Sequence, residues 1–311
     1  MENTRISENA PELWKHLFPW PKPESHKYTR GHAFIVGHDA ASTGATILAA
    51  RAAHRLCGVV TLACEPDALP IYAVSSPASF TRPFTTVSEL LKAIEIRPPN
   101  ALLIGPGAGV QEWTREAVLA LLSLHIPTVL DADALSAFAE NPERLFAAIE
   151  VCSAPVVLTP HGGEFKRLFG ATCHPERSEG SHAAGDPSPS AQDDKIKAAL
   201  RAAKTSHAIV LFKGAETVIA APPQNPLPRA GEGRVRAIIN RNAPPTLAIA
   251  GAGDILAGMI AALLAGGMPA WEAAACAAWL HGEAAQAFGF GLAATDLPDL
   301  IPGALARLPA G

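Results

Sequence analysis

At 311 residues the chain is long enough for two domains, but α/β folds often use this length as one unit. Hydrophobic residues make up 49% of the chain and charged residues 17%, so material for a large core is available, and a net charge of −4 gives no electrostatic reason to expect nucleic-acid binding. The five cysteines are scattered without a Cys-x-x-Cys pair, which predicts reduced, mostly structural thiols and no zinc site.

The N-terminal residues 1–24 are polar and then rich in proline and tryptophan, and we expect them to form a lead before a single domain at 25–311. They do not have the pattern of a signal peptide. Apolar runs such as residues 255–264 are too short, and too closely flanked by glycine, to span a bilayer. We therefore expect a cytoplasmic protein with no membrane partner.

From residue 32 onward, short apolar runs with strand character alternate with stretches rich in alanine and leucine that have helical character. The expected strands are residues 32–36, 59–63, 101–104, 128–130, 155–158 and 208–212, and the helices between them include 45–56 and 112–124. Nearly continuous apolar strands separated by helices predict an α/β fold with a parallel sheet covered on both faces. Ligands of such sheets bind beyond the carboxyl ends of the strands.

Two segments interrupt this alternation. Residues 172–194 contain almost no apolar side chain, and residues 222–236 are rich in proline, glycine and charge. We expect the first to be a mobile loop and the second to be an insertion in a hairpin, both disordered and without a chemical role. Cys173 and His174 are of metal-binding types, but a solvated loop fits their polar surroundings better.

Glycines and carboxylates follow two of the middle strands. The run Gly105-Pro106-Gly107-Ala108-Gly109 allows the backbone to approach a ligand closely, or it reflects turn chemistry alone. It has neither the ending of a Walker loop nor the spacing of a dinucleotide fingerprint. Asp131 and Asp133 stand where a cation or a water near phosphates can be held, and for Asp133 a helix N-cap is an equally good explanation.

Polar residues also follow the next two strands. In Thr159-Pro160-His161-Gly162-Gly163-Glu164, the imidazole of His161 is suited to a polar substrate group. Glu164 is suited to organising Mg²⁺ and water, or it simply favours the first turn of a helix. In Lys213-Gly214-Ala215-Glu216-Thr217, the lysine or its neighbouring amides can meet a nucleotide phosphate, although a lone lysine after a strand is usually only solvated.

The octapeptide Gly251-Ala252-Gly253-Asp254-Ile255-Leu256-Ala257-Gly258 places a carboxylate between glycines and the first apolar turn of an expected helix. Glycines let backbone N–H groups converge on an anion, and the helix dipole adds partial positive charge there. Because a phosphate repels a carboxylate, Asp254 is better suited to taking the proton of an incoming hydroxyl. Taken alone, the octapeptide is also explained by a turn with an N-cap aspartate.

In their order along the chain, these motifs resemble those of the NAD(P)H-hydrate dehydratase family, whose members are ribokinase-like enzymes. The resemblance covers residues 25–308 apart from the two interruptions, and it also includes the following segments: Gly31-His32-Ala33-Phe34-Ile35-Val36-Gly37, Gly44-Ala45 and Leu280-His281-Gly282. It implies a three-layer α/β/α fold with a mostly parallel central sheet. It also implies a dehydratase that stands alone, because only the short lead precedes Ser25 and a fused epimerase domain is not expected.

The resemblance further implies the reaction and its ligands. The family uses ADP, or ATP in eukaryotes, with Mg²⁺ to phosphorylate the hydroxyl of the S-epimer of hydrated NADH or NADPH, after which phosphate leaves and the nicotinamide double bond returns. By resemblance, the residues that contact the hydrated cofactor are Ala45, Gly107, His161 and Asp254. Those that contact the adenine nucleotide are Lys213, Gly214, Ala215, Glu216, Thr217 and Gly253. The expected partners are a separate NAD(P)H-hydrate epimerase and further copies of the chain in a tetramer.

The sequence departs from the family at a few positions. The usual Gly-Gly-Thr/Ser-Gly-Asp reads Ala250-Gly251-Ala252-Gly253-Asp254, and Ala243 stands where the family usually has glycine. Because Ala-Gly-Asp is common among sugar kinases of the same superfamily, an alternative is a kinase of a small alcohol such as a vitamin precursor. A third hypothesis is a nucleotide-binding relative that has lost catalysis. The segments around His161 and His281 favour the dehydratase, and the retained Asp254 argues against the inactive relative.

Overall fold

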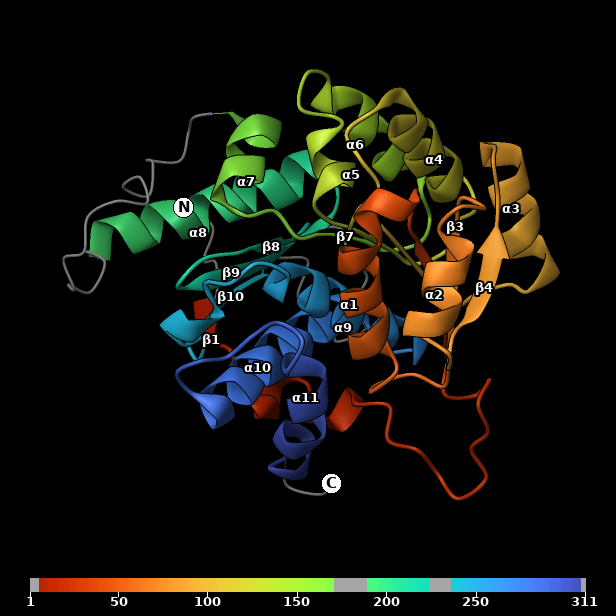
Figure 1. Ribbon diagram of the computed structural model, residues 1–311. Helices are drawn as coiled ribbons and strands as arrows, with labels where there is room; N and C mark the ends of the chain where they lie inside the picture. Colours follow the sequence, from red (N-terminus) through yellow and green to blue (C-terminus); the bar gives the residue numbers. More distant parts are fainter. Residues whose placement is uncertain (1–5, 171–188, 224–235, 309–311) are drawn as a thin grey trace.

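The computed structural model describes residues 6–170, 189–223 and 236–308 and shows a sheet between two layers of helices (Figure 1). The described strands form one sheet. In spatial order they are β1 (Ile6–Glu8), β10 (Arg236–Asn240), β9 (Thr217–Ala221), β8 (Ile209–Phe212), β7 (Val156–Leu158), β6 (Thr128–Leu130), β5 (Ala101–Ile104), β2 (His32–Val36), β3 (Val59–Cys64) and β4 (Phe80–Pro83). Neighbouring strands pair in parallel except at β9, which is antiparallel to both β8 and β10. The mostly parallel three-layer fold is confirmed.

Helices cover both faces of the sheet, as Figure 1 shows. One layer comprises α1 (Thr43–Ala53), α2 (Leu69–Ser75), α9 (Ala252–Ala265), α10 (Ala270–Phe288) and α11 (Leu297–Ala306). The other comprises α3 (Val87–Ile96), α4 (Glu112–Leu122), α5 (Asp133–Ser136), α6 (Pro142–Val151), α7 (Gly162–Phe169) and α8 (Pro189–Ser206). Short 3₁₀ turns are η1 (Pro11–Leu13), η2 (Lys15–Leu17), η3 (Ala40–Ser42) and η4 (Pro245–Leu247). No helix among the described residues combines the length and apolar character that a membrane span needs.

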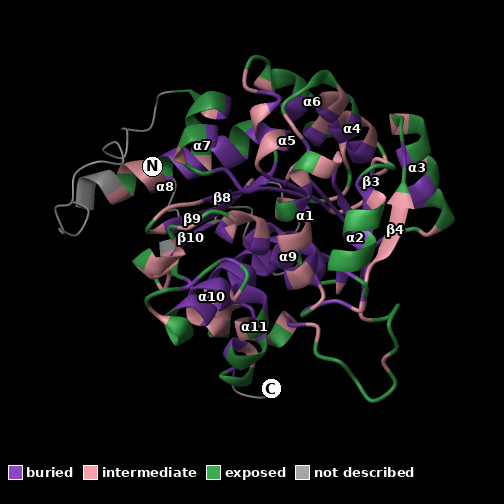
Figure 2. Ribbon diagram, viewed as in Figure 1, coloured by how far each residue is buried: buried purple, intermediate pink, exposed green. Residues whose placement is uncertain are grey.

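The strands are apolar throughout because both of their faces are buried. In β2, Ala33 and Ile35 belong to the core under α9 and α10, whereas Phe34 and Val36 belong to the core on the opposite face. This alternation is the two-residue period of a strand, and it explains why nearly every position must be hydrophobic. Figure 2 shows the buried residues concentrated in the sheet and in the helix surfaces that face it.

The expected elements agree closely with the observed ones. The strands predicted at 32–36, 101–104 and 128–130 have those bounds, and the other three differ by one residue at one end. Helix α1 ends at Ala53 although the alanine-rich pattern continued to residue 56, because the chain tightens there: the amide of Arg55 donates to Ala52 and that of Leu56 to Ala53.

Part of the expected lead at 1–24 lies inside the fold. Strand β1 pairs in parallel with β10, and Trp14 is fully buried. The Trp14 indole donates to Asn9 Oδ1 over 3.1 Å, and Asn9 Nδ2 donates to Asn240 Oδ1 over 2.7 Å. A three-residue strand is too short to show periodicity, which is why the sequence did not reveal it.

The two interruptions lie largely outside the described residues, which exclude 171–188 and 224–235. Helix α8 begins at Pro189, so residues 189–194 are helical where we expected a loop. The buried apolar residues of this helix, which include Ile196, Ala199 and Ala203, recur at helical spacing. Their packing stabilises the helix, which therefore extends back into the polar residues at its start. The strands that flank the second interruption, β9 and β10, are an antiparallel pair, as expected for a hairpin.

The packing of α9 on α1 gives a test of the fold. A Cβ added to Gly258 of α9 would overlap the carbonyl oxygen of Ala49 in α1. We expect Gly258→Ala to lower the free energy of unfolding by about 2 kcal/mol, although alanine favours a helix by about 1 kcal/mol. Gly303→Ala in α11 is the matched control, since no described atom lies within 4 Å of its added Cβ, and it should be neutral or stabilising. Urea unfolding of both variants is the measurement, and a Gly258→Ala protein as stable as the parent would contradict this close contact.

Candidate functional site

The expected site residues meet at the carboxyl edge of the sheet. Strands β2, β5, β6, β7 and β8 are parallel, so the loops that leave their carboxyl ends lie at the same edge of the sheet. These loops carry the glycine run at 105–109, Asp131, His161 and Lys213, and the N-terminus of α9 lies among them.

A buried ion pair lies at the centre of this edge. The Lys213 ammonium donates to Asp131 Oδ1 over 2.7 Å, and the Thr159 hydroxyl donates to the same oxygen over 2.7 Å. The Asp131 side chain is 1% exposed and that of Lys213 is 19% exposed. The Asp131 carboxylate is therefore held inside the protein, while the Lys213 side chain keeps a small exposed fraction.

The backbone on both sides of Asp131 is tightly constrained. Ala132 has φ 49°, a left-handed conformation that costs a non-glycine residue about 1–3 kcal/mol. It separates Asp131, which points inward, from Asp133, whose Oδ2 accepts the Gly109 amide over 2.8 Å. A Cβ on Gly105 would overlap the carbonyl oxygen of Asp131. The Asp133 carboxylate thus fixes the position of the glycine run through Gly109. The N-cap residue of α5 is Ala132, so Asp133 is not that N-cap.

The start of α9 faces the ion pair. Gly251 is its N-cap with φ 89°, and Asp254 lies in its first turn. A Cβ on Gly253 would stand 3.2 Å from Lys213 Nζ and 4.0 Å from Asp131 Oδ2. Amides in a first turn have no acceptor within their helix, so this turn and the ammonium together present positive charge to the same space.

The carboxyl group of Asp254 is half-buried, and its pKa is raised to about 7. Burial is the main cause, the Asp131 carboxylate adds to it, and the Lys213 ammonium opposes it. A carboxyl group that titrates near neutrality can exchange a proton with a hydroxyl under physiological conditions.

Lys213 remains a cation in this setting. Burial by itself lowers its pKa, but the carboxylates of Asp131, Glu164 and Asp254 outweigh burial and raise that pKa above its usual value. One ammonium group therefore faces three carboxyl groups that come from β6, α7 and α9.

His161 and Glu164 form the capping box of α7. The His161 imidazole accepts the Gly163 amide over 3.0 Å, and Glu164 Oε2 accepts the His161 amide over 2.8 Å. Glu164 is buried, and its pKa is raised to about 7, first by burial and then by Asp131 against the opposing effect of Lys213. The His161 side chain is 56% exposed, so its ring is accessible to solvent. The helix-turn explanation for Glu164 therefore accounts for the contacts of its carboxylate.

The segment from Lys213 to Thr217 turns from β8 into β9. Ala215 is exposed, and Glu216 accepts a hydrogen bond from the Arg241 guanidinium over 2.9 Å. Thr217 is buried, and its hydroxyl donates to the Gly214 carbonyl over 3.2 Å. Of these side chains, that of Lys213 reaches the start of α9. Glu216 is paired with Arg241, which follows β10, and Thr217 is engaged within its own turn.

Ala45 and Gly107 lie on segments that pack together beside the start of α9. Gly107 has φ 70°, and a Cβ there would overlap the carbonyl oxygen of Ser42, which precedes α1. Ala45 lies in the first turn of α1, one turn before Leu48, and Leu48 is the side chain nearest to a Cβ placed on Gly251. The β5 loop, the start of α1 and the start of α9 are therefore in close contact.

The structure gives specific contacts to two residues whose segments the sequence analysis named without assigning them a role in the site. Thr159 makes the hydrogen bond to Asp131, although the sequence showed it only as the residue before Pro160. His281 of α10 is buried beside the start of α9, hydrogen-bonds the Ala252 backbone, and has its pKa lowered to about 4, mainly by burial. His281 is therefore neutral, and its hydrogen bond to the Ala252 backbone stabilises the first turn of α9.

Within the described residues, no group of three or more His, Cys, Asp or Glu side chains is arranged to hold a metal ion. Among those same residues, the four cysteines are free thiols, as expected, and Cys173 lies outside them.

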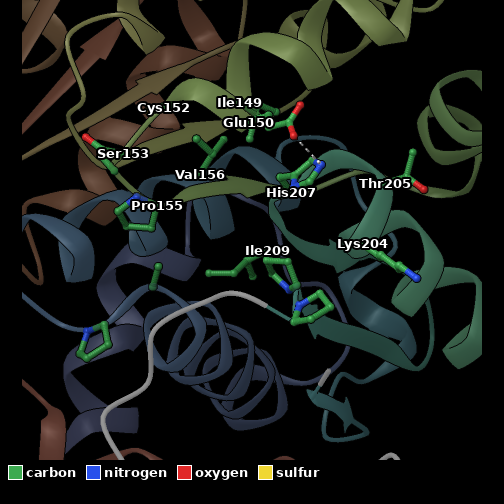
Figure 3. A pocket seen from close by; sticks show the side chains of 15 residues that line it. Ile149, Glu150, Cys152, Ser153, Pro155, Val156, Lys204, Thr205, His207 and Ile209 are labelled. Atoms are coloured by element: carbon green, nitrogen blue, oxygen red, sulfur yellow. Dashed lines mark ion pairs between the residues drawn. The ribbon is translucent and has the colours of Figure 1, made fainter. Parts of the chain in front are cut away.

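A cavity lies away from this cluster. Its volume is about 870 Å³, and it is lined around the starts of β7 and β8, with Val156, Ile209 and the paired Glu150 and His207 among its residues (Figure 3). The starts of parallel strands lie at the edge opposite to their carboxyl ends. This cavity is therefore separate from the cluster around Asp254.

Comparison with known proteins gives consistent matches. The model of a family described as NAD(P)H-hydrate dehydratase matches residues 33–304. The ADP-dependent (S)-NAD(P)H-hydrate dehydratase of Neisseria meningitidis is 33% identical over 274 residues, covering 87% of this chain and 81% of that protein. The bifunctional NAD(P)H-hydrate repair enzyme of Salinibacter ruber is 33% identical over 305 residues, covering 91% of this chain, which spans 50% of that enzyme.

Solved structures agree with these sequence matches. The crystal structure of the ADP/ATP-dependent NAD(P)H-hydrate dehydratase from Bacillus subtilis, co-crystallised with ATP and Mg²⁺, has a TM-score of 0.76 and 26% identity and covers 99% of both chains. Because the family model matches most of the chain and these relatives share a third of its residues, the chain belongs to the NAD(P)H-hydrate dehydratase family.

Proposed function

We propose that this protein dehydrates the S-epimer of hydrated NADH or NADPH with ADP or ATP as co-substrate, and so restores the reduced cofactor. The observation that carries the proposal is the placement of Asp254 in the first turn of α9, beside the Lys213–Asp131 ion pair. The names of the Neisseria and Bacillus relatives support the choice of substrate and nucleotide.

The chemistry follows from the leaving group. Hydroxide leaves carbon poorly, whereas a phosphate ester leaves well. In the proposed reaction the hydrate hydroxyl forms a bond to the terminal phosphorus of the nucleotide as the bond from that phosphorus to the bridging oxygen breaks. ADP then leaves as AMP, or ATP as ADP. Phosphate next departs from the ring carbon and a proton leaves the adjacent carbon, so the double bond is restored without oxidation or reduction.

Each part of the cluster has a proposed task. Asp254 accepts the hydroxyl proton, for which its pKa of about 7 is suitable. The first-turn amides of α9, together with Lys213, stabilise negative charge on the transferred phosphoryl group. The nucleotide then occupies the side of Asp254 next to residues 213–217, and the hydrate occupies the side next to Ala45, Gly107 and His161.

Mg²⁺ is the proposed metal, and its fit depends on the carboxylates. This ion usually keeps several waters and binds one or two protein carboxylates together with substrate phosphates. Glu164 is engaged in the capping box, but a carboxylate oxygen can accept a second hydrogen bond, so it is able to hold a water bound to Mg²⁺. When bound, the ion would neutralise negative charge on the nucleotide phosphates.

We also propose two partners. A separate NAD(P)H-hydrate epimerase would supply the S-epimer, since the bifunctional relatives carry a further part beyond the half that this chain matches. The resemblance to the family favours a homotetramer, which sedimentation of the purified protein would test.

Asp254→Asn tests the proposed base. The substitution keeps the shape of the side chain but removes its basicity, so we expect turnover to fall by about a hundredfold or more while nucleotide binding survives. The measurement follows the return of absorbance from reduced nicotinamide when the protein is incubated with hydrated NADH, Mg²⁺ and either nucleotide. Asp299→Asn, on the surface of α11, is the control and should retain parental turnover. Loss of absorbance recovery in the parent, with phosphorylation of a small alcohol instead, would identify a kinase.

The pKa of Asp254 predicts a pH dependence. A general base must be ionised, so kcat/KM for the hydrate should rise with pH, reach its half-maximal value near pH 7 and then level off. The measurement is a profile of kcat/KM between about pH 5 and pH 9. An unchanged profile down to pH 5 would show that Asp254 is ionised throughout and that burial does not raise its pKa as the structure implies.

The two-sided arrangement predicts separable binding defects. His161→Ala should weaken binding of the hydrated cofactor and leave nucleotide affinity nearly intact, whereas Gly214→Val should block the nucleotide and spare the hydrate. Because His161 also caps α7, His161→Asn is a useful companion that keeps a capping acceptor. Calorimetric titration of each variant with each ligand is the measurement. Equal weakening of both ligands by His161→Ala would exclude this arrangement.

A further inference from the structure

Thr159 and Asp131 have no catalytic task in the proposed function, yet Asp131 Oδ1 accepts hydrogen bonds of 2.7 Å from both Thr159 and Lys213 beside the start of α9. We propose that they are positioning residues, which hold the Lys213 ammonium at the start of α9 so that its charge meets the phosphoryl group during transfer. This inference rests on the proposed function and deepens it. It means that kcat depends in part on two side chains that contact neither ligand.

The geometry makes Asp131 a fixed acceptor. Its carboxylate is 1% exposed, and its Oδ1 accepts both the Thr159 hydroxyl and the Lys213 ammonium over 2.7 Å each. Ala132 is held at φ 49°, and the Asp131 carbonyl packs on Gly105, so the backbone cannot adjust freely. These contacts hold the carboxylate in one orientation, and the buried Thr159 hydroxyl contributes to it through its hydrogen bond.

Lys213 needs such an anchor because its long side chain is flexible and three carboxyl groups attract it. Glu164 and Asp254 act on its charge, but among the described residues Asp131 is the carboxylate whose oxygen the ammonium reaches at hydrogen-bond distance. Without this bond the ammonium could move toward Asp254 and neutralise the proposed base. The anchor thus keeps the cation and the base apart.

The anchored ammonium lies where phosphoryl charge would develop. Gly253 has no Cβ, and one placed there would stand 3.2 Å from Lys213 Nζ, so the ammonium adjoins the amides of the first turn. As the bond from the hydroxyl oxygen to phosphorus forms and the bond to the nucleotide breaks, Lys213 stays protonated and transfers nothing. A charge that stabilises the transition state more than the bound nucleotide changes kcat and leaves KM nearly constant.

The first experiment compares two substitutions of Thr159. Thr159→Val keeps the shape and removes the hydroxyl, and we expect kcat to fall by about tenfold with the nucleotide KM changed by less than about twofold. Thr159→Ser keeps the hydroxyl and should restore kcat to near the parental value even if it lowers the melting temperature. Thr128→Val is the matched control, because Thr128 is a buried residue of β6 at the amino end of the strand, where its hydroxyl donates to Ile126. It should leave kcat unchanged.

The second experiment asks whether Thr159 acts through Lys213. Lys213→Met should lower kcat by about a hundredfold, and adding Thr159→Val should lower it no further, because the group being positioned is gone. A tenfold effect of Thr159→Val that persists in the Lys213→Met protein would overturn the inference, as would a parental kcat in Thr159→Val or an equal loss in Thr159→Ser.

The proposed function and this inference fail in different ways. If the parent protein restores no reduced cofactor with either nucleotide, the function itself is wrong and the positioning role falls with it. If the parent is active but the Thr159 and Lys213 effects are additive, the function stands and the positioning role is wrong.

Discussion

One buried carboxylate, that of Asp131, joins the parts of the protein that form the site. Its carbonyl packs against Gly105 after β5, and its side chain accepts hydrogen bonds from Thr159 after β7 and Lys213 after β8. Asp131 itself follows β6, so four consecutive strands of the sheet converge on it. A charge removed from water is tolerated only when it is paired and hydrogen-bonded, and this requirement forces those loops together. The start of α9 packs against the ion pair of Asp131 and Lys213 at Gly253.

The electrostatic balance of the site follows from that arrangement. Three carboxyl groups, those of Asp131, Glu164 and Asp254, share one ammonium, which cannot compensate all of them. The Asp131 carboxylate accepts the hydrogen bond from the Lys213 ammonium. The pKa values of the other two rise to about 7, chiefly because both groups are buried and secondarily because Asp131 is near. The interaction that stabilises the edge of the sheet therefore also leaves a carboxyl group at the start of α9 ready to bind and release a proton near neutral pH.

Close contacts link α1 and α9. Gly258 lets α9 pack on the backbone of α1 at Ala49, and Gly251 lets the start of α9 approach Leu48. Helix α1 carries Ala45 on the proposed hydrate side, and α9 carries Asp254. The relative position of these two residues thus depends on backbone packing, which is less deformable than contacts between long side chains.

The sequence alone determined the α/β class, six strands to within a residue at each end, and the order of the motifs, because buried parallel strands and glycine turns leave strong local patterns. It did not show β1, whose three residues are too few for periodicity, nor the helical start of α8 at Pro189. The contact between Asp131 and Lys213, 82 residues apart, and the role of Thr159 in it were decided by the tertiary structure. Local propensity sets what each segment becomes, but which charges share a buried space depends on strand order, and strand order is a property of the whole sheet.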